Sequence, residues 1–533
     1  MAISRFLDPG DRRHGDGATA VIQRTGAGGA VAVEWGEVER MERTFRNDLL
    51  GRREEGIIPH FSMRSAESLS FVLASLNSGA RVALLNPRLR RRQVSDLVAA
   101  CGATVGVIDG HGCHSLRDQN SEEAAGPLRE WILINEHLRQ PFHSKAIDAL
   151  RASYAISEPS TLEQVGESSS DTHALGGGVC LFTSGSTGRP KGVLISARDL
   201  IGRAEAEVEW YELGPDDTVL NILPWSFDVG LNQVLSAVVA GSTIVMSESW
   251  MPADLLKSVE EFGITGISGV PKIWSDLLRS GLDPSEHDLS SLRYITVSGG
   301  GLPTEQLERL QDFFPDVGII KTYGQTEAFR PTCLLPEHFR DKMASVGRPF
   351  GGCSVYITRA DGSQAGPMEH GEIVHVGLGT MEGYLGGNDE EKLGPNPFRE
   401  TGDDPAVAVF TGDQGYIDQD GFLFVLGRRD AMIKLHGVRV YPSEASAQIA
   451  RSLEMPEATA VPLRRDSETI LVAFLACEDA AFDEIALLRR LRRDLPPYLV
   501  PSRLFRVGSI PRTTTGKPDI GALVRVAEER FDS

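Results

Sequence analysis

The strongest constraint on the fold is the alternation of short apolar, β-rich segments with segments of helical periodicity. Residues 80–85 and 104–108 have the pattern of buried strands, whereas residues 65–76 and 93–100 have the apolar spacing of helices. Parallel β-α-β units produce this order of elements. The strand pattern returns at 179–182, 218–223, 243–246, 265–268, 294–297 and 318–322. We therefore predict an α/β fold with a large N-terminal domain of layered sheets and helices.

Two parts of the chain depart from this alternation. Residues 110–178 are more polar, and we interpret them as helices with exposed loops. Short strands at 355–357, 372–376 and 423–426 are separated by Gly/Asp turns, which predicts a small antiparallel β unit. The polar segment 386–404, with two Pro and several Gly and Asp, is typical of a surface loop.

Charge is spread unevenly along the chain. The 533 residues include 54 Lys and Arg against 74 Asp and Glu, a net charge of −20. Residues 430–533 hold 15 basic and 15 acidic side chains, so the whole negative excess lies in residues 1–429. We predict an N-terminal domain, 1–429, and a small α+β C-terminal domain, 430–533. A surface of this charge repels nucleic acid, so we expect no nucleic-acid partner.

The composition indicates a cytoplasmic protein. Residues 1–16 are charged and lack the apolar core of a signal peptide. No apolar run reaches the length of a membrane span. The six cysteines are scattered without a C-x-x-C pair, which favours reduced thiols over a disulfide framework or a zinc site.

The segment Thr183–Gly192, TSGSTGRPKG, has the composition of a phosphate-binding loop. It follows a strand and precedes a segment that we interpret as helical. Glycines let a ligand approach the backbone, hydroxyl and N–H groups bind phosphate oxygens, and Lys191 adds a positive charge. A Walker A loop is a poor match, because Lys191 is preceded by Pro190 and followed by Gly192. A flexible linker rarely follows a buried strand, which leaves phosphate binding as the better interpretation.

From about residue 60 to 520, the chain resembles the adenylate-forming superfamily of acyl-CoA synthetases, luciferases and peptide-synthetase adenylation domains. Stand-alone amino-acid or β-amino-acid adenylation enzymes are the nearest group in this resemblance. The segments that carry it occur in the superfamily's order; after Thr183–Gly192 they are Gly299–Leu302, Tyr323–Glu327, Gly371–Val374, Gly383–Leu385, Thr411–Asp413, Gly427–Asp430, Lys434–Arg439, Pro442–Glu444 and Pro511–Lys517.

The resemblance implies ATP and Mg²⁺ as ligands and assigns a role to each matching residue. Lys191, Glu327 and Lys517 are implied as catalytic, with Glu327 also holding the metal. The implied nucleotide-binding residues are Thr183, Ser184, Gly185, Ser186, Thr187, Gly188, Gly300, Tyr323, Gly324, Thr326, Asp413 and Arg428. A carboxylate is a hard oxygen ligand suited to Mg²⁺. Its two oxygens can also accept hydrogen bonds from two ribose hydroxyls. Without the other motifs, Glu327 would equally be a solvated loop residue, and Asp413 an ordinary turn residue.

The implied chemistry has two steps. A carboxylate attacks the α-phosphate of ATP to give an acyl-adenylate and pyrophosphate, and a thiol then displaces AMP. The resemblance places a hinge at Asp430, so that the C-terminal domain is mobile and Lys517 leaves between the steps. It also places Gly437 along the tunnel of the thiol. Closure of one domain on the other would assemble the site.

The identity of the acid depends on the segment that contains Phe227 and Asp228. Peptide-synthetase adenylation domains have Phe-Asp-x-Ser here, and their Asp binds the substrate ammonium; this chain has Gly230 in place of Ser. A partly buried Asp228 favours a cationic partner. The alternatives are a helix N-cap or the Asp of fatty-acyl-AMP ligases. We also assign Ser298 to the acid pocket.

Arg330 gives a second indication of the acid. By the resemblance it lies at or beside the acid pocket, where it could bind a second carboxylate bidentately. With Asp228, that would suit an aspartate-like or β-amino dicarboxylic acid. The alternative is that Arg330 pairs with a carboxylate of the protein itself.

The acceptor of the acyl group is expected to come from outside the chain. No phosphopantetheine attachment motif appears, so we expect a separate carrier protein or CoA. The favoured function is amino-acid adenylation for a carrier protein. The alternatives are an acyl-CoA synthetase for a fatty or aromatic acid, and a relative that binds nucleotide without turnover.

Overall fold

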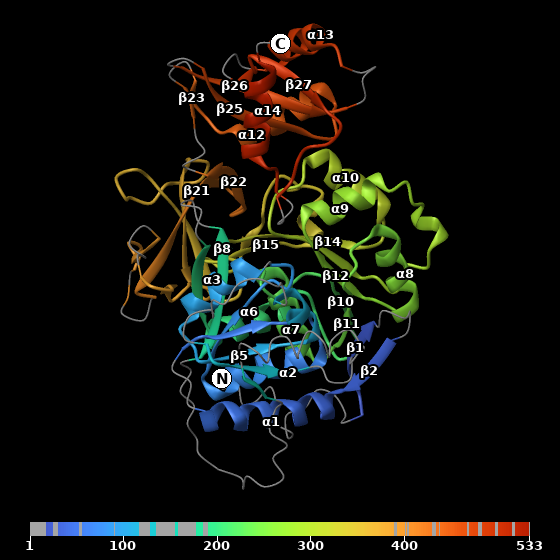
Figure 1. Cartoon of the computed structure of the whole chain (residues 1–533). Helices are drawn as coiled ribbons and strands as arrows, with labels where there is room; N and C mark the ends of the chain where they lie inside the picture. The colour runs from blue at the N-terminus through green and yellow to red at the C-terminus, as the bar shows by residue number, and fades with distance from the viewer. Residues whose placement is uncertain are drawn as a thin grey trace.

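The computed structural model describes residues 17–24, 30–52, 56–89, 91–116, 128–134, 155–157, 177–184, 190–387, 392–399, 401, 405–428, 433–435, 438–465, 468–477, 482–495, 499–513 and 517–531. A large N-terminal domain carries a small C-terminal domain at one end (Figure 1). The α/β prediction is therefore confirmed.

The first sheet of the N-terminal domain has nine strands over the described ranges, in the order β16-β15-β14-β13-β12-β10-β11-β1-β2. From β14 to β1 every neighbouring pair is parallel. The bounds are β1 Thr19–Arg24, β2 Ala30–Glu34, β10 Thr218–Asn221, β11 Thr243–Met246, β12 Gly266–Gly269, β13 Tyr294–Val297, β14 Gly318–Tyr323, β15 Thr332–Leu334 and β16 Arg348–Pro349. Parallel strands place all their carboxyl ends along one edge, where ligands bind in α/β folds.

The second sheet has eight strands over the described ranges, in the order β19-β9-β8-β4-β3-β5-β6-β7. The bounds are β3 Ile58–Phe61, β4 Arg81–Leu84, β5 Val105–Ile108, β6 Glu130–Leu133, β7 Ala155–Ser157, β8 Gly178–Ser184, β9 Pro190–Ser196 and β19 Gly383–Tyr384. Its strand β9 is antiparallel to β8.

Helices fill the space between the two sheets and cover their outer faces. The largest apolar core joins residues of both sheets with α1, α2, α6 and α7. Helices α8, α9 and α10 pack on the other face of the first sheet, and α3 and α4 on that of the second. The bounds are α1 Trp35–Arg52, α2 Ala66–Ser78, α3 Arg91–Cys101, α4 Gly110–Leu116, α6 Ala197–Trp210, α7 Asp228–Ala240, α8 Pro252–Phe262, α9 Pro271–Arg279, α10 Thr304–Phe313 and α11 Pro336–Phe339, with a 3₁₀ turn at Pro284–Glu286.

The antiparallel β unit and the C-terminal α+β pattern are both present. The unit consists of β17 Cys353–Thr358, β18 Gly371–Gly377, β20 Leu393–Pro395, β21 Val407–Ile417 and β22 Leu423–Arg428. The C-terminal domain contains β23 Ile433–Leu435, β24 Val438–Val440, β25 Ala458–Arg465, β26 Glu468–Ala476 and β27 Arg503–Val507, with α12 Pro442–Leu453, α13 Glu484–Asp494 and α14 Ile520–Arg530.

Three local predictions differ from the structure. The segment after the phosphate-loop candidate is strand β9 and not a helix; Val193 and Ile195 alternate with less buried residues and lie in the core. The polar region 110–178 contains strands β6 and β7, because the buried Trp-Ile-Leu run of β6 extends the sheet beside β5. The predicted loop 386–404 includes the short strand β20, which pairs with β21.

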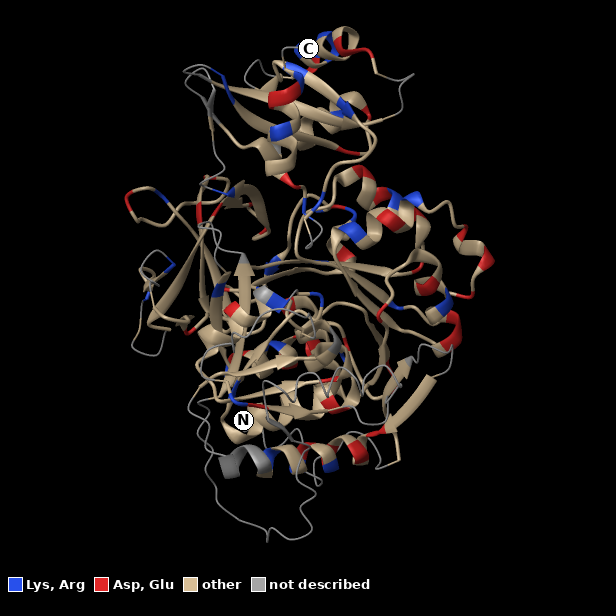
Figure 2. Cartoon of the chain, viewed as in Figure 1, with Lys and Arg blue, Asp and Glu red and all other residues tan. Residues whose placement is uncertain are grey.

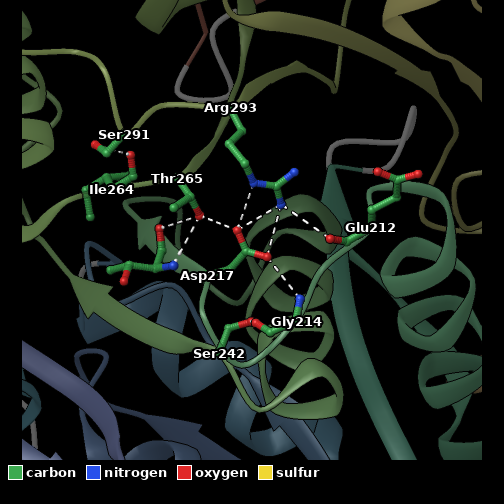
Figure 3. A network of polar contacts seen from close by, with 9 residues as sticks. Glu212, Gly214, Asp217, Ser242, Ile264, Thr265, Ser291 and Arg293 are labelled. Carbon is green, nitrogen blue, oxygen red and sulfur yellow. Dashed lines mark hydrogen bonds and ion pairs between the residues drawn. The ribbon is translucent and has the colours of Figure 1, made fainter.

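A polar network ties together the amino ends of three strands of the first sheet (Figure 3). Asp217 precedes β10, Thr265 precedes β12 and Arg293 precedes β13. Arg293 Nη2 donates to Asp217 Oδ1 at 2.8 Å, and Thr265 Oγ1 donates to the same oxygen at 2.6 Å. The network fixes these strands at the end opposite to their carboxyl ends, so it supports the fold and is remote from the candidate site.

The charged side chains follow the division into two domains (Figure 2). Acidic side chains are prominent along the side of the N-terminal domain formed by α8, α9 and α10, whereas both signs occur over the C-terminal domain. No helix in the described ranges is long and apolar enough to cross a membrane.

Candidate active site

The candidate residues gather at the carboxyl ends of the parallel strands, facing the C-terminal domain (Figure 1). Asp228 begins α7 after β10, Ser298 follows β13 directly, and Tyr323 ends β14. Gly324 makes the turn that follows; a Cβ there would lie 2.6 Å from the backbone N of Arg330. That close approach explains why the chain has glycine at this point.

Asp413 is the centre of a nucleotide-binding candidate formed by β14, β21 and β22. The hydroxyl of Tyr323 and the amide of Gln325 each donate to Asp413 Oδ2 at 2.6 Å. Arg428 Nη1 lies 3.5 Å from Asp413 Oδ1 and donates to the Thr411 carbonyl at 3.0 Å. Burial and the Asp413 carboxylate raise the pKa of Tyr323 well above its ordinary value, so the phenol stays neutral and donates. Tyr323, Asp413 and Arg428, which come from three separate motifs, thus lie in one cluster.

Lys392 belongs to the same cluster and was not predicted. Its Nζ donates to the Thr411 carbonyl at 2.5 Å and lies 3.5 Å from the Gln325 side-chain oxygen. Burial lowers its pKa, and the neighbouring Arg428 lowers it further. Little in the sequence indicates Lys392, because it stands in the polar segment that we interpret as a surface loop.

Lys191 and Glu327 meet at the ring of Tyr384. The Tyr384 hydroxyl donates to Glu327 Oε1 at 2.7 Å, and Lys191 Nζ lies 4.9 Å from the centre of the Tyr384 ring. Strand β19 brings Tyr384 here by pairing with Val193 of β9. Lys191 and Glu327 are both half-buried. The structure therefore brings the predicted lysine and the predicted metal ligand to one place, and adds Tyr384, which the sequence analysis had included only as part of a motif.

The acid-pocket candidates form a buried polar group between α6, α7 and β13. Arg330 Nη1 forms an ion pair with Glu207 of α6, and their side chains are 2% and 3% exposed. Arg330 Nη2 donates to Ser298 Oγ at 3.3 Å. Burial disfavours the charge of Arg330, but the Glu207 carboxylate outweighs it and keeps the pKa above its ordinary value. The sequence allows two interpretations of Arg330, pairing with a substrate carboxylate or with a carboxylate of the protein. The structure shows the second, with Glu207 as the partner.

Asp228 is half-buried and stands at the first helical position of α7, after Phe227 at the N-cap. The N-cap interpretation of Asp228 is therefore wrong, because Phe227 occupies the N-cap position and no side chain caps this helix end. Burial raises the pKa of the Asp228 carboxyl, while the positive charges of Arg330 and Lys517 oppose that shift. Within the described residues, no side chain donates a hydrogen bond to Asp228.

Lys517 comes to this site from the C-terminal domain. It is exposed, and its carbonyl accepts from the backbone N–H of Thr513 at 2.8 Å in a short loop before α14. Its charge acts on Asp228 across the domain boundary. The two domains also touch where the Gln306 amide of α10 donates to the Pro456 carbonyl at 2.9 Å. That Lys191 and Lys517, from different domains, serve one site stays a prediction.

The glycine-rich loop, the hinge and the thiol-tunnel residue that we predicted fall largely outside the residues that the structure describes. Gly185, Ser186, Thr187, Gly188, Asp430 and Gly437 lie outside the described residues. Thr183 and Ser184 end β8, directly before the glycine-rich loop, and Thr326 is half-buried in the loop after β14. A Cβ at Gly300 would meet Pro271 at 3.3 Å, so this loop runs close to the start of α9.

One residue of the acid pocket was not found from the sequence. Glu207 lies on α6 among buried apolar residues, and a lone carboxylate on such a face signals a buried partner. Its partner Arg330 is distant in sequence, which is why composition and spacing do not reveal the pair.

A small, partly open pocket lies beside the loop that leads into α7. It lies at the carboxyl ends of β3, β4, β10 and β11, and Ser226 forms part of its wall, two residues before Asp228. Arg64 and Arg88 also line it, and the Arg88 guanidinium lies 3.9 Å from the centre of the Trp250 ring. Among the residues that the structure describes, Nε and Nη1 of the buried Arg64 have no hydrogen-bond partner.

Comparison with known proteins assigns the family. Residues 12–385 match the model of a family described as AMP-binding enzyme. The chain belongs to the AMP-binding enzymes. These are the AMP-forming ligases of the adenylate-forming superfamily, which confirms the resemblance seen in the motifs.

Two curated relatives of this AMP-binding enzyme are a carrier protein ligase and a peptide-named synthase. The D-alanine--D-alanyl carrier protein ligase of Bacillus cereus (strain G9842) is 32% identical over 352 residues, which cover 64% of this chain and 68% of that protein. Gramicidin S synthase 2 of Aneurinibacillus migulanus is 26% identical over 483 residues, which cover 88% of this chain and 10% of that protein. The chain thus spans about a tenth of the length of that synthase.

Two solved structures share the fold of this AMP-binding enzyme. The amide bond synthetase McbA of Marinactinospora thermotolerans superposes with a TM-score of 0.78 at 22% identity, covering 98% of each chain. ATP-bound MatB of Rhodopseudomonas palustris superposes with a TM-score of 0.77 at 20% identity, covering 100% of each chain. At these identities, the likeness shows the fold: a large N-terminal and a small C-terminal domain.

Proposed function

We propose that this AMP-binding enzyme adenylates an amino acid and transfers the aminoacyl group to the thiol of a separate carrier protein. The observation that carries the choice of an amino acid is Asp228. Its carboxylate is half-buried, receives no side-chain hydrogen bond within the described residues, and lies beside an arginine already paired with Glu207. A substrate ammonium would pair this carboxylate and offset the cost of its burial.

The remaining residues suit the first step. A carboxylate oxygen of the amino acid attacks the α-phosphorus of ATP, a P–O bond forms, and the P–O bond to pyrophosphate breaks. Asp413 would accept hydrogen bonds from the ribose hydroxyls, a role that its cluster with Tyr323 and Arg428 supports. Lys191 and Lys517 would offset negative charge that develops on the phosphates.

Glu327 is the residue that would hold Mg²⁺. Tyr384 fixes its first carboxylate oxygen by a hydrogen bond of 2.7 Å, and no described residue forms a hydrogen bond with the second. In the described ranges, no group of three or more His, Cys, Asp or Glu is placed to hold a metal ion, so the other ligands would be triphosphate and water oxygens. Mg²⁺ bound there would supply charge neutralisation of the triphosphate.

In the second step, the acceptor sulfur attacks the acyl carbon, the C–O bond to AMP breaks, and the thiol proton is released. The named D-alanyl carrier protein ligase supports a carrier protein as the acceptor. The pocket that Arg64 and Arg88 line includes Ser226, two residues before Asp228 in the chain, and the two guanidinium groups suit a phosphate group. CoA also carries phosphate groups, so an acyl-CoA synthetase is the alternative, and it predicts AMP release with CoA and an uncharged acid.

The test is ATP–pyrophosphate exchange with a panel of amino acids and plain carboxylic acids. Asp228→Asn keeps the shape of the side chain and removes its charge, so we expect kcat/KM for the amino acid to fall roughly 100-fold or more, since a broken buried pair costs about 3–5 kcal/mol. Asp216→Asn changes an exposed carboxylate of the same domain and should leave the exchange unchanged. Equal exchange by wild type and Asp228→Asn contradicts the proposal.

A further inference from the structure

Tyr384 lies where strand β19 pairs with the glycine-rich hairpin of β8 and β9. It is opposite Val193 of β9, and the neighbouring Leu385 N–H donates to the Gly192 carbonyl at 2.7 Å. Lys191 stands two residues before Val193, and the side chains of such diagonal neighbours can meet across a strand pair. Here Lys191 Nζ lies 4.9 Å from the centre of the Tyr384 ring. The pairing of β19 with β9 therefore fixes Tyr384 beside the predicted catalytic lysine.

The segment that carries Tyr384 also contacts the loop that carries Glu327. The Met381 N–H donates to the Glu327 carbonyl at 3.1 Å, and an isolated antiparallel bridge joins Thr380 to Ala328. The Tyr384 hydroxyl donates to Glu327 Oε1 at 2.7 Å. Tyr384 is 7% exposed, so packing leaves its side chain little freedom to turn away from Glu327. One side chain thus connects the glycine-rich hairpin to the predicted metal ligand.

The hydrogen bond from Tyr384 makes the two carboxylate oxygens of Glu327 unequal. A hydroxyl that donates to a carboxylate forms a short, charge-assisted bond, and this bond uses part of the acceptor capacity of Oε1. Among the residues that the structure describes, none forms a hydrogen bond with Oε2. Oε2 is therefore the oxygen that is left for a cation.

Divalent cations differ in how they use a carboxylate. Mg²⁺ is small, requires nearly octahedral geometry at about 2.0–2.1 Å, keeps several waters and adds phosphate oxygens to one or two carboxylates. Ca²⁺ takes about six to eight oxygens at about 2.3–2.6 Å in a flexible arrangement, and it can use both oxygens of one carboxylate. A carboxylate that a phenol holds by one oxygen suits Mg²⁺ better than Ca²⁺.

We propose that Tyr384 is a positioning residue that makes Glu327 bind its cation through one oxygen and so favours Mg²⁺ over Ca²⁺ beside the triphosphate. This inference rests on the part of the proposed function in which Glu327 holds the metal ion. The hydroxyl of Tyr384 acts on the ion only through Glu327. The ring of Tyr384 has a separate role, because it faces Lys191.

The experiment measures ATP binding by calorimetry without the acid substrate, so the result does not depend on turnover. The dissociation constant of ATP is determined with Mg²⁺, with Ca²⁺ and with EDTA. We expect wild type to bind ATP more tightly with Mg²⁺ than with Ca²⁺. Tyr384→Phe removes only the hydroxyl, and it should reduce this preference by roughly 10-fold, since the loss of a partner of a metal ligand typically lowers metal affinity about 10–100-fold.

Three comparisons separate ion selection from general support of the fold. With EDTA, Tyr384→Phe should bind ATP as wild type does, because the ring that faces Lys191 is kept. Glu327→Gln should abolish the Mg²⁺ preference, and adding Tyr384→Phe to it should cause no further change, because the hydroxyl acts through the carboxylate. Tyr356→Phe is the matched control: Tyr356 packs on Phe398 in the antiparallel β unit, so this variant should keep the wild-type preference.

The outcomes are distinguishable. Equal binding of ATP by wild type with Mg²⁺ and with Ca²⁺ overturns the inference. A preference that Glu327→Gln abolishes and Tyr384→Phe leaves intact overturns the role of Tyr384 and keeps Glu327 as the metal ligand. A further loss in the double variant also overturns that role, because Tyr384 would then act by another route. A preference that Glu327→Gln leaves intact overturns both the metal assignment and this inference, whereas the choice of an amino acid is tested separately by pyrophosphate exchange.

Discussion

Replacing Glu207 by Gln tests whether the buried ion pair with Arg330 organises the acid pocket. The two side chains are 3% and 2% exposed, and Glu207 also accepts a hydrogen bond from Ser236. Removing the carboxylate charge leaves the buried Arg330 cation without its direct partner, and breaking such a pair costs about 3–5 kcal/mol. For a domain of this size, about 2 °C is lost per kcal/mol, so the melting temperature should fall by about 6–10 °C.

The assay is thermal unfolding of Glu207→Gln beside Glu209→Gln. Glu209 is exposed on the same helix, and its variant should melt within about 1 °C of wild type, because surface substitutions rarely exceed ±0.5 kcal/mol. The double variant Glu207→Leu with Arg330→Met should recover most of the loss, since an apolar replacement of a whole buried pair is close to neutral. Equal melting temperatures for Glu207→Gln and Glu209→Gln would show that Arg330 does not depend on Glu207, and would contradict the role of this ion pair in the acid pocket.

Two further predictions concern pH. Burial raises the pKa of Asp228, and only the ionised carboxylate pairs with an ammonium. As the pH drops, kcat/KM for the amino acid should therefore fall, and the fall should begin above the ordinary Asp pKa of about 3.9. A pH profile of wild type identical to that of Asp228→Asn contradicts this prediction. Burial also lowers the pKa of Lys321 to about 7. Above about pH 7, Lys321 is therefore neutral in the folded protein but protonated in the unfolded chain, which binds more protons. The free energy of unfolding should then rise with pH up to about pH 8.5, where thiols begin to titrate. Lys321→Met should remove that slope in denaturant titrations at pH 7.0 and 8.2, and an unchanged slope would rule out Lys321 as its source.

The sequence was informative where local periodicity and dense motifs determine the structure. The strands β10 to β14 and helices α2 and α3 follow from apolar spacing alone. Asp413 and Tyr323 were grouped through the family motifs, although 90 residues separate them. The strand β9 was misassigned because its residues follow a glycine-rich loop, and only pairing with β8 settles their conformation.

The acid pocket was less predictable because its contacts are tertiary. Arg330 and Glu207 are 123 residues apart, and no spacing rule connects them. The sequence offered a substrate carboxylate and a protein carboxylate as equal partners for Arg330, and only the packing of α6 against the β14 loop decides between them.

The most direct test of the central claim compares one amino acid with its own 2-hydroxy acid. ATP–pyrophosphate exchange by the wild-type enzyme is measured with the best amino acid of the panel and with the acid in which a hydroxyl replaces the amino group. Pairing of the ammonium with Asp228 predicts exchange with the amino acid and a loss of roughly 100-fold or more with the hydroxy acid. Equal exchange with both acids would contradict the account, because Asp228 would then have no cation to recognise.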